Sequence, residues 1–176
     1  NKYNTDLANT LGNLVNRSIA MTNKYFGGTV TKGEIFDDFD RELIATAKES
    51  IEKHHSLMDV YRNADAVEAV MALARRCNKY IDETAPWALA KDEANKDRLN
   101  AVLYNLLECI RILGTLLYPI MPDSADSIKA QICNNNTALE FGLTESFTVG
   151  AATPLFARID MEKALAEIAE EQAKKA

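Results

Sequence analysis

The chain has 176 residues, of which 47% are hydrophobic and 26% are charged, and it carries a net charge of −6. This is enough apolar material for one sizeable core and little more than one domain. The acidic balance argues against a general binder of polyanions, because nonspecific affinity for nucleic acids comes mainly from cations that neutralise phosphates.

A first helix is predicted from about residue 6 to residue 26, where Gly27 and Gly28 end it. Its apolar residues follow helical spacing and are Leu7, Leu11, Leu14, Val15 and Ile19. Successive residues of a helix are rotated by about 100° around its axis. On the side opposite the apolar residues, a row of amide and cationic side chains therefore falls within about 40° of one line along the helix. These residues are Lys2, Asn9, Asn13, Arg17 and Lys24. The row is either a solvated helix face or a stripe of polar groups suited to the flat edge of an unstacked base.

A second helix is predicted from residue 34 or 37 to residue 58, and a third from about residue 64 to residue 84. The apolar stripe of the second helix consists of Phe39, Leu43, Ile44, Ala47, Ile51 and Met58. Asn63 or Asp65 is the expected N-cap of the third helix, since both side chains can accept hydrogen bonds from free backbone N–H groups.

A fourth helix is predicted from about residue 95 to residue 118. It is apolar around most of its circumference, which indicates burial on several sides. Pro119 and Pro122 end it, and Asp123 or Ser124 is expected to cap a short fifth helix that runs to about residue 133.

Residues 134–158 read as irregular, because their Asn, Gly and Pro residues are turn signals, and Asp160 is expected to cap a last helix. No β alternation or repeat competes with the helical pattern. We therefore expect an all-α fold, a bundle of about five or six helices. It should form a single domain over residues 1–176, with residues 1–133 as the bundle core and residues 134–176 packed back against it.

The only tryptophan, Trp87, directly follows Pro86. Proline cannot donate its backbone N–H and disfavours helical geometry in the residue before it, so the third helix should stop or kink near Ala85. Trp87 therefore lies at a break between helices. Its ring either fills the core there or offers a π face to a planar ligand such as a nucleobase.

Catalytic and metal-binding patterns do not emerge from the sequence. His54 and His55 are adjacent, so on a helix they point about 100° apart and cannot bind one metal as an i, i+4 pair would. We find no Gly-rich phosphate loop and no Gly-x-Ser-x-Gly turn. We therefore expect neither a catalytic residue nor a metal site in this chain.

The three cysteines, Cys77, Cys109 and Cys133, are far apart in apolar segments and are expected to be buried, reduced thiols. No stretch approaches the length of a membrane span, and a signal peptide is not evident, so we expect a cytoplasmic location. Because the first residue is not Met and the chain starts inside a helical pattern, we expect it to be a piece of a larger protein.

Several of these segments together resemble the C-terminal anticodon-binding domain of methionyl-tRNA synthetase, and they span nearly the whole chain in the expected order. The matching segments are DLANTLGNLVNR (6–17), NKYFGG (23–28), the Ala85-Pro86-Trp87 corner with Lys91, LYPIMP (117–122) and PLFARID (154–160). One departure is Ala157, where the family usually has proline. It bears on the stiffness of that loop and on no recognition residue.

The resemblance implies the helical anticodon-binding domain of a class Ia synthetase. Such a domain reads the CAU anticodon of methionine tRNAs, initiator and elongator alike, for a catalytic domain of the same polypeptide. By the family's pattern, Asn13 and Arg17 hydrogen-bond anticodon bases, and Trp87, positioned by Pro86, stacks on the first of them. The possible supporting residues are Asn9, Asn16, Lys24 and Lys91.

The same resemblance implies that this piece binds and does not catalyse. ATP, methionine and a zinc ion would belong to the catalytic part of the parent methionine--tRNA ligase, with no cofactor here. Neither DNA nor a membrane is an expected partner.

Two alternatives remain at this point. The chain could be the anticodon domain of a sibling class I synthetase, for isoleucine, valine, leucine or cysteine. It could also be a helical protein-interaction bundle in which Trp87 is a core residue. The exposure of the indole distinguishes this second alternative from base recognition.

Overall fold

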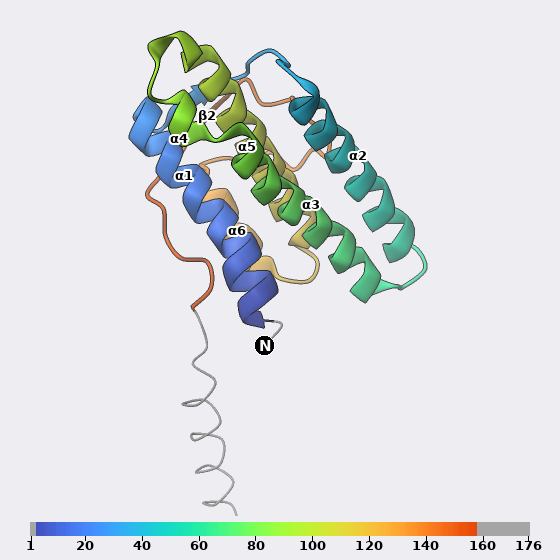
Figure 1. The fold of residues 1–176 in the computed structure, drawn as a ribbon. Helices are drawn as coiled ribbons and strands as arrows, with labels where there is room; N and C mark the ends of the chain where they lie inside the picture. Colours follow the sequence, from blue (N-terminus) through green and yellow to red (C-terminus); the bar gives the residue numbers. More distant parts are fainter. Residues whose placement is uncertain (1–2, 158–176) are drawn as a thin grey trace, which may run out of the picture.

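Helices α1, α2, α3 and α5 lie side by side in the computed structural model, which describes residues 3–157 (Figure 1). The elements, in chain order, are the π-helix η1 (Tyr3–Gly12), α1 (Asn13–Phe26), β1 (Thr29–Thr31), α2 (Asp38–Met58), α3 (Asn63–Thr84), α4 (Pro86–Leu89), the 3₁₀ turn η2 (Glu93–Asn95), α5 (Lys96–Leu117), α6 (Pro122–Gln131) and β2 (Ser146–Thr148). The helix α5 contacts α1, α2, α3 and α6. The all-α prediction is confirmed, and so are the long helices to within a few residues.

The first helix is more complex than its sequence pattern indicates. Its first ten residues form the π-helix η1, and regular α-helix begins only at Asn13. A π-helix has more residues per turn than an α-helix, so the expected angular position of Asn9 relative to Asn13 does not hold. The end is as predicted: Gly27 adopts a left-handed conformation, with φ of 60°, and its N–H bonds to the carbonyl of Asn23.

The predicted helix caps are only partly correct. Asp37 caps α2 by accepting a hydrogen bond from the backbone N–H of Asp40. The expected caps of α3 and α6 were wrong, because these helices start from Arg62 and Met121 with no side-chain cap hydrogen bond among the described residues. In α3 the carboxylate of Asp65 instead pairs with Arg62 at 2.7 Å. In α6 Pro122 takes the first position, where its missing N–H costs nothing.

The central helix α5 is buried almost throughout, as its apolar width predicts. With η2 it forms a segment, Glu93–Leu117, that is long and apolar enough to cross a membrane, contrary to the expectation that no stretch approaches this length. Within the described part of the chain, 89% of the relevant window is buried inside the bundle. The apolar surface of this helix is therefore covered by protein.

A small antiparallel sheet was missed from the sequence. Strands β1 and β2 pair with Val30 opposite Phe147, and both of these side chains are buried. The ring of Phe147 packs against that of Tyr104 on α5, with centroids 5.8 Å apart. Each strand has three residues and one buried side chain, which is too short for an alternating pattern to be visible.

A buried ion pair on α5 holds the irregular segment after α6 through hydrogen bonds to the backbone of that segment. Arg111 pairs with Glu108 at 2.9 Å, and both side chains are buried. The remaining donors of Arg111 reach the backbone carbonyls of Asn136, Ala138 and Glu140, and Glu108 accepts a bond from the N–H of Gly142. The predicted helix after Asp160 lies outside the described residues, and the division of the domain at residue 133 stays a prediction.

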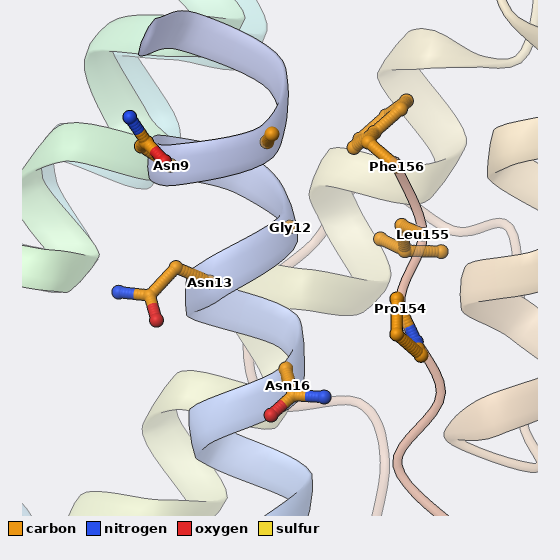
Figure 2. A pocket seen from close by; sticks show the side chains of 8 residues that line it. Asn9, Gly12, Asn13, Asn16, Pro154, Leu155 and Phe156 are labelled. Carbon is orange, nitrogen blue, oxygen red and sulfur yellow. The ribbon is translucent and has the colours of Figure 1, made fainter. Parts of the chain in front are cut away.

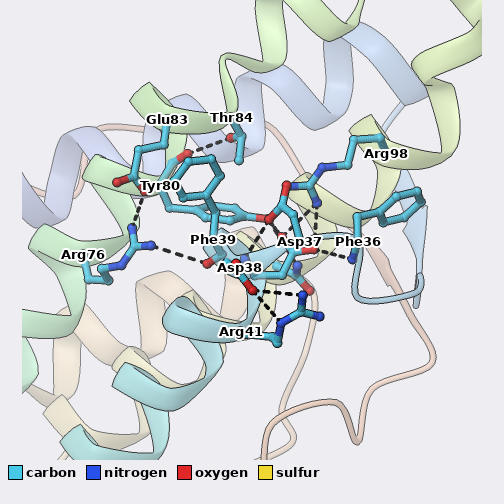
Figure 3. A network of polar contacts seen from close by, with 12 residues as sticks. Phe36, Asp37, Asp38, Phe39, Arg41, Arg76, Tyr80, Glu83, Thr84 and Arg98 are labelled. Atoms are coloured by element: carbon cyan, nitrogen blue, oxygen red, sulfur yellow. Dashed lines mark hydrogen bonds and ion pairs between the residues drawn. The ribbon is translucent and has the colours of Figure 1, made fainter.

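A buried polar network replaces part of the expected apolar stripe of α2. Phe39 is 41% exposed, whereas the neighbouring Asp40 is fully buried. Asp40 accepts hydrogen bonds from the hydroxyl of Tyr80 at 2.5 Å and from Arg98 at 2.8 Å (Figure 3). Burial raises the pKa of Asp40, but these hydrogen bonds outweigh it and hold the pKa below 3.8. The network joins α2, α3 and α5 at one end of the bundle.

The expectation for the cysteines holds for two of the three. Cys77 and Cys109 are buried, but Cys133 is exposed, and all three are free thiols. Cys133 follows the end of α6 with a φ of 48°, so it belongs to a surface turn and not to the core.

Candidate nucleic-acid interface

The corner between α3 and α4 fixes the position of Trp87. Ala85 is the C-cap of α3 and has a left-handed backbone, with φ of 43° and ψ of 63°, as many helix ends do. Pro86 disfavours the right-handed helical conformation that would continue the helix through Ala85. The Ala85 N–H still bonds to the carbonyl of Ile81 at 3.0 Å, and the Ala85 carbonyl accepts from Ala88 at 2.7 Å. The chain therefore turns within one residue.

Pro86 is buried at the first position of α4, while Trp87, the next residue, is 44% exposed. A large part of the indole is thus available to a ligand. The interpretation of Trp87 as a fully buried core residue does not hold.

Arg17 of α1 lies against this exposed ring. Its guanidinium carbon is 6.0 Å from the centroid of the Trp87 ring, a distance at which a cation and a π face attract each other. A guanidinium nitrogen of Arg17 is also 3.7 Å from a carboxylate oxygen of Asp82 on α3. Three helices therefore meet at Arg17, which keeps a third of its side-chain surface exposed.

A groove extends from Arg17 along the junction of α1, η1 and α3, and we call it the Arg17 groove. It has a volume of about 290 Å³. Its lining residues are Asn9, Thr10, Asn13, Arg17, Arg75, Asn78 and Asp82. The structure thus brings together three residues of the predicted polar row, Asn9, Asn13 and Arg17.

The α3 side of the Arg17 groove was not predicted. Asn78 donates to the carbonyl of Thr10 at 3.1 Å and so connects the two walls. Arg75, Asn78 and Asp82 follow a spacing of three and four residues, which is the signature of one helix face. This polar face of α3 was the available signal in the sequence.

A second groove lies on the flank of η1 and α1 away from α3, and we call it the Phe156 groove (Figure 2). It has a volume of about 370 Å³. Its lining residues are Ala8, Asn9, Gly12, Asn13, Asn16, Pro154, Leu155 and Phe156. Asn16 therefore lies on this flank and does not join the residues around Arg17.

The remaining predicted residues are farther from the two grooves. The Lys24 ammonium lies 5.2 Å from the ring centroid of Tyr25, about two turns beyond Arg17. Lys91 is exposed just after the end of α4. Neither of them lines the Arg17 or the Phe156 groove. Lys2 lies outside the described residues.

His54 is buried, and neither of its ring nitrogens has a hydrogen-bond partner among the described residues. Burial, and then the neighbouring His55, lower the pKa of His54 below its ordinary 6.5. Over residues 3–157, no group of three His, Cys, Asp or Glu side chains is arranged to hold a metal ion.

Comparison with known proteins agrees with a helical anticodon-binding fold. A solved structure of apo methionyl-tRNA synthetase from Mycobacterium tuberculosis superposes with a TM-score of 0.82 and 34% identity, over 90% of this chain and 34% of that chain. The structure of the same enzyme with methionyl-adenylate gives a TM-score of 0.81, over 89% of this chain and 32% of that one.

A family model described as the anticodon binding domain of methionyl tRNA ligase matches residues 30–174. The chain therefore belongs to this family. The methionine--tRNA ligase of Clostridium perfringens is 42% identical over 95% of the chain, and that of Bacillus subtilis is 38% identical over 95%. The chain spans about a quarter of the length of these relatives, 27% and 26% respectively. This membership decides against a sibling class I synthetase.

Proposed function

We propose that this chain is the anticodon-reading part of a methionine--tRNA ligase and that it recognises the CAU anticodon of initiator and elongator methionine tRNAs. The observation that carries the proposal is the position of Arg17, whose guanidinium lies over the exposed ring of Trp87 at one end of a groove lined by Asn13. A stacking surface and hydrogen-bonding groups thus lie within reach of one nucleotide.

In the proposed mode of binding, a base leaves the anticodon loop and stacks on Trp87. This stacking supplies about 1–3 kcal/mol but does not distinguish one base from another, because every base has a π face. Discrimination comes from the base edge. Arg17 offers only donors, whereas the amide of Asn13 offers both a donor and an acceptor. Together they suit an edge that presents acceptors beside an amino group, as cytosine does.

The supporting roles that we propose rest on the positions of these residues. Asn9 would extend the reading surface along the Arg17 groove, and Asn16 would act from the opposite flank. Lys24 and Lys91 would contact RNA phosphates, since both are exposed cations outside the two grooves. Pro86 would act only by holding Trp87 at the corner.

The parent protein would supply what this chain lacks. The catalytic part of the same polypeptide would attach methionine to tRNA in an ATP-dependent reaction, with ATP, methionine and zinc bound there. Contacts from that part to the acceptor stem would provide most of the affinity, so the isolated chain should bind tRNA weakly. From this role in translation we infer a cytoplasmic protein with neither DNA nor a membrane as partner.

The test is a titration of the chain with two RNA hairpins that are identical except for a CAU or a scrambled anticodon loop. Trp87 is the only tryptophan, so its fluorescence at low salt reports on this corner directly. Quenching by the CAU hairpin and not by the scrambled one is the expected result. An equal response, or none, would contradict base recognition and favour a protein-interaction bundle.

A further inference from the structure

We propose that the Phe156 groove is a second nucleobase site, which holds another base of the same RNA loop while Trp87 holds the first. This inference rests on the proposed function and adds a site that the residues around Arg17 do not form. Its walls come from segments far apart in the chain, the start of α1 and residues 154–156.

The chemistry of the lining suits an uncharged planar group. Residues of η1 and the start of α1 line one side, where the amide of Asn16 projects toward the groove, and residues 154–156 provide an apolar wall opposite. None of the described lining residues is charged, so the groove lacks the cations that hold phosphates. Amides can donate to and accept from the edge of a base, and an aromatic ring can stack on its face. The lining therefore favours a base over a phosphate.

The position of the groove relative to Arg17 suits a neighbouring nucleotide. Asn9 and Asn13 line both grooves, so the two sites are separated only by the width of one helix. Figure 2 shows Asn9 and Asn13 projecting from the side of the helix away from residues 154–156, with Asn16 on the nearer side. A loop that splays out its bases can place one on each flank of this helix.

The apolar wall is held against the helix by contacts already present in the free protein. A Cβ atom on Gly12 would lie 3.3 Å from Cδ2 of Phe156, so glycine at this position lets the ring approach closely. Upstream, Asn23 on α1 donates to the carbonyl of Gly150 at 2.8 Å, and Thr153 donates to the side chain of Gln131 at 3.0 Å. A preformed wall lowers the ordering cost of binding.

The experiment measures the affinity of the full 176-residue chain for CAU hairpins in which one loop base at a time is removed to leave an abasic nucleotide. The variants are Phe156→Leu, which keeps an apolar side chain but removes the ring, and Asn16→Ala. Asn135→Ala is the matched control, since Asn135 is an exposed asparagine that does not line the groove.

In the wild type, removal of one loop base should abolish the quenching of Trp87 fluorescence, and this base is the one that stacks on Trp87. Removal of a second, different base should weaken binding about tenfold, because that base stacks in the Phe156 groove. Phe156→Leu should bind the intact hairpin about tenfold more weakly than the wild type does. Its affinity should not fall again when the base of the Phe156 groove is removed. Removal of the base at Trp87 should cost Phe156→Leu as much as it costs the wild type. Asn16→Ala should weaken binding through the same position, and Asn135→Ala should behave as the wild type.

The inference would be overturned if Phe156→Leu and Asn16→Ala bound the intact hairpin like the wild type, or if their losses were the same for every abasic hairpin. Saturable binding of a free nucleoside that depends on Phe156 but is not competed by the hairpin would also overturn it. If the wild type failed to distinguish CAU from scrambled loops, the proposed function itself would fail. Circular dichroism melting shows whether either variant has lost its fold, and Asn16→Ala provides the test if Phe156→Leu has.

Discussion

Arg17 has two neighbours of opposite character, the ring of Trp87 and the carboxylate of Asp82. The Asp82 side chain is 71% exposed and 3.7 Å away, and ion pairs of this kind contribute about 0–1 kcal/mol to stability. Arg17 can therefore exchange Asp82 for a base acceptor at little cost. The exposed indole beside it makes this residue pair the centre of the proposed recognition.

Replacing Trp87 with Ala should weaken binding of the CAU hairpin by about 1–3 kcal/mol, because the stacking surface is lost. The free energy of unfolding should fall by about 1–2 kcal/mol, less than for a fully buried tryptophan, since the residue is 44% exposed. Filter binding and urea unfolding measure the two quantities. Trp87→Phe is the control and should recover part of the affinity. A loss of stability of about 3–5 kcal/mol would instead indicate a core role.

Replacing Arg17 with Ala should weaken the CAU hairpin by about 1–3 kcal/mol while nonspecific RNA is affected much less, as expected for a contact to a base edge. Competition binding with both RNAs measures the difference. Arg41→Ala is a matched control, because Arg41 is an exposed arginine on α2 that pairs with Asp38. Equal losses for the two RNAs would identify Arg17 as a phosphate contact.

His54 should make the stability of the bundle depend on pH. Its folded-state pKa is lowered, so the unfolded chain takes up a proton near pH 6.5 while the folded protein resists it. The free energy of unfolding should therefore fall as the pH drops below about 6.5, by at most about 1.4 kcal/mol per pH unit from this group. Urea midpoints between about pH 7 and pH 5 measure it. The fall should be much smaller in His54→Gln and only slightly smaller in His55→Gln, which removes the lesser of the two causes of the pKa shift, and no difference between the two variants would contradict the assignment.

At the scale of elements, the corner between α3 and α4 is the feature that converts a helix end into a binding surface. Pro86 ends α3 and begins α4, and the left-handed Ala85 makes the turn. Two positions later the indole is outside the core, while Pro86 itself is buried. A non-glycine residue at this φ is strained, so the backbone of Ala85 lowers the stability of the protein while it fixes the orientation of Trp87.

Replacing Ala85 with Gly should raise the free energy of unfolding by about 0.5–1 kcal/mol, because glycine adopts the left-handed conformation without a Cβ clash. Ala85→Val should lower it, since a β-branched side chain is disfavoured there. Urea unfolding of the two variants beside the wild type measures both effects. A destabilised Ala85→Gly would show that Ala85 is not strained.

At the scale of the whole molecule, the Phe156 groove is formed by contacts between the two ends of the described chain. Strands β1 and β2 pair residues more than a hundred positions apart, and this pairing carries residues 150–156 back toward α1. The buried pair of Glu108 and Arg111 fastens the intervening segment to α5. The Phe156 groove therefore depends on the folding of the whole bundle, whereas the Arg17 groove requires only η1, α1 and α3.

The acidic net charge of the chain predicts how its RNA binding responds to salt. Recognition through bases releases few counterions, whereas each neutralised phosphate of a single strand contributes about −0.7 to the slope of log K against log salt. With Lys24 and Lys91 as the proposed phosphate contacts, the slope for the CAU hairpin should be no steeper than about −2. Titrations between about 50 and 200 mM salt measure it. A much steeper slope would mean that the chain binds the RNA mainly through its phosphates.

Parts of the interface could be read from the sequence because they are local. Asn13 and Arg17 are one turn apart on one helix, and Pro86 forces the break that exposes Trp87. The side chains that complete the two grooves could not be assigned in this way. Asp82 and Asn78 join the site only because α3 lies beside α1, and Phe156 only because a distant segment returns to the same helix.

The sequence by itself determined the all-α architecture and the extents of the long helices, because helical periodicity and Gly or Pro breaks act over a few residues. It also determined the Pro86 corner and the placing of Asn13 and Arg17 one turn apart on α1. Only the tertiary structure decided the pairing of β1 with β2, the burial of Asp40 beneath Tyr80 and Arg98, and the two grooves on either flank of α1. These features depend on which elements pack together, and the free energy of such contacts comes from residues that no local pattern connects.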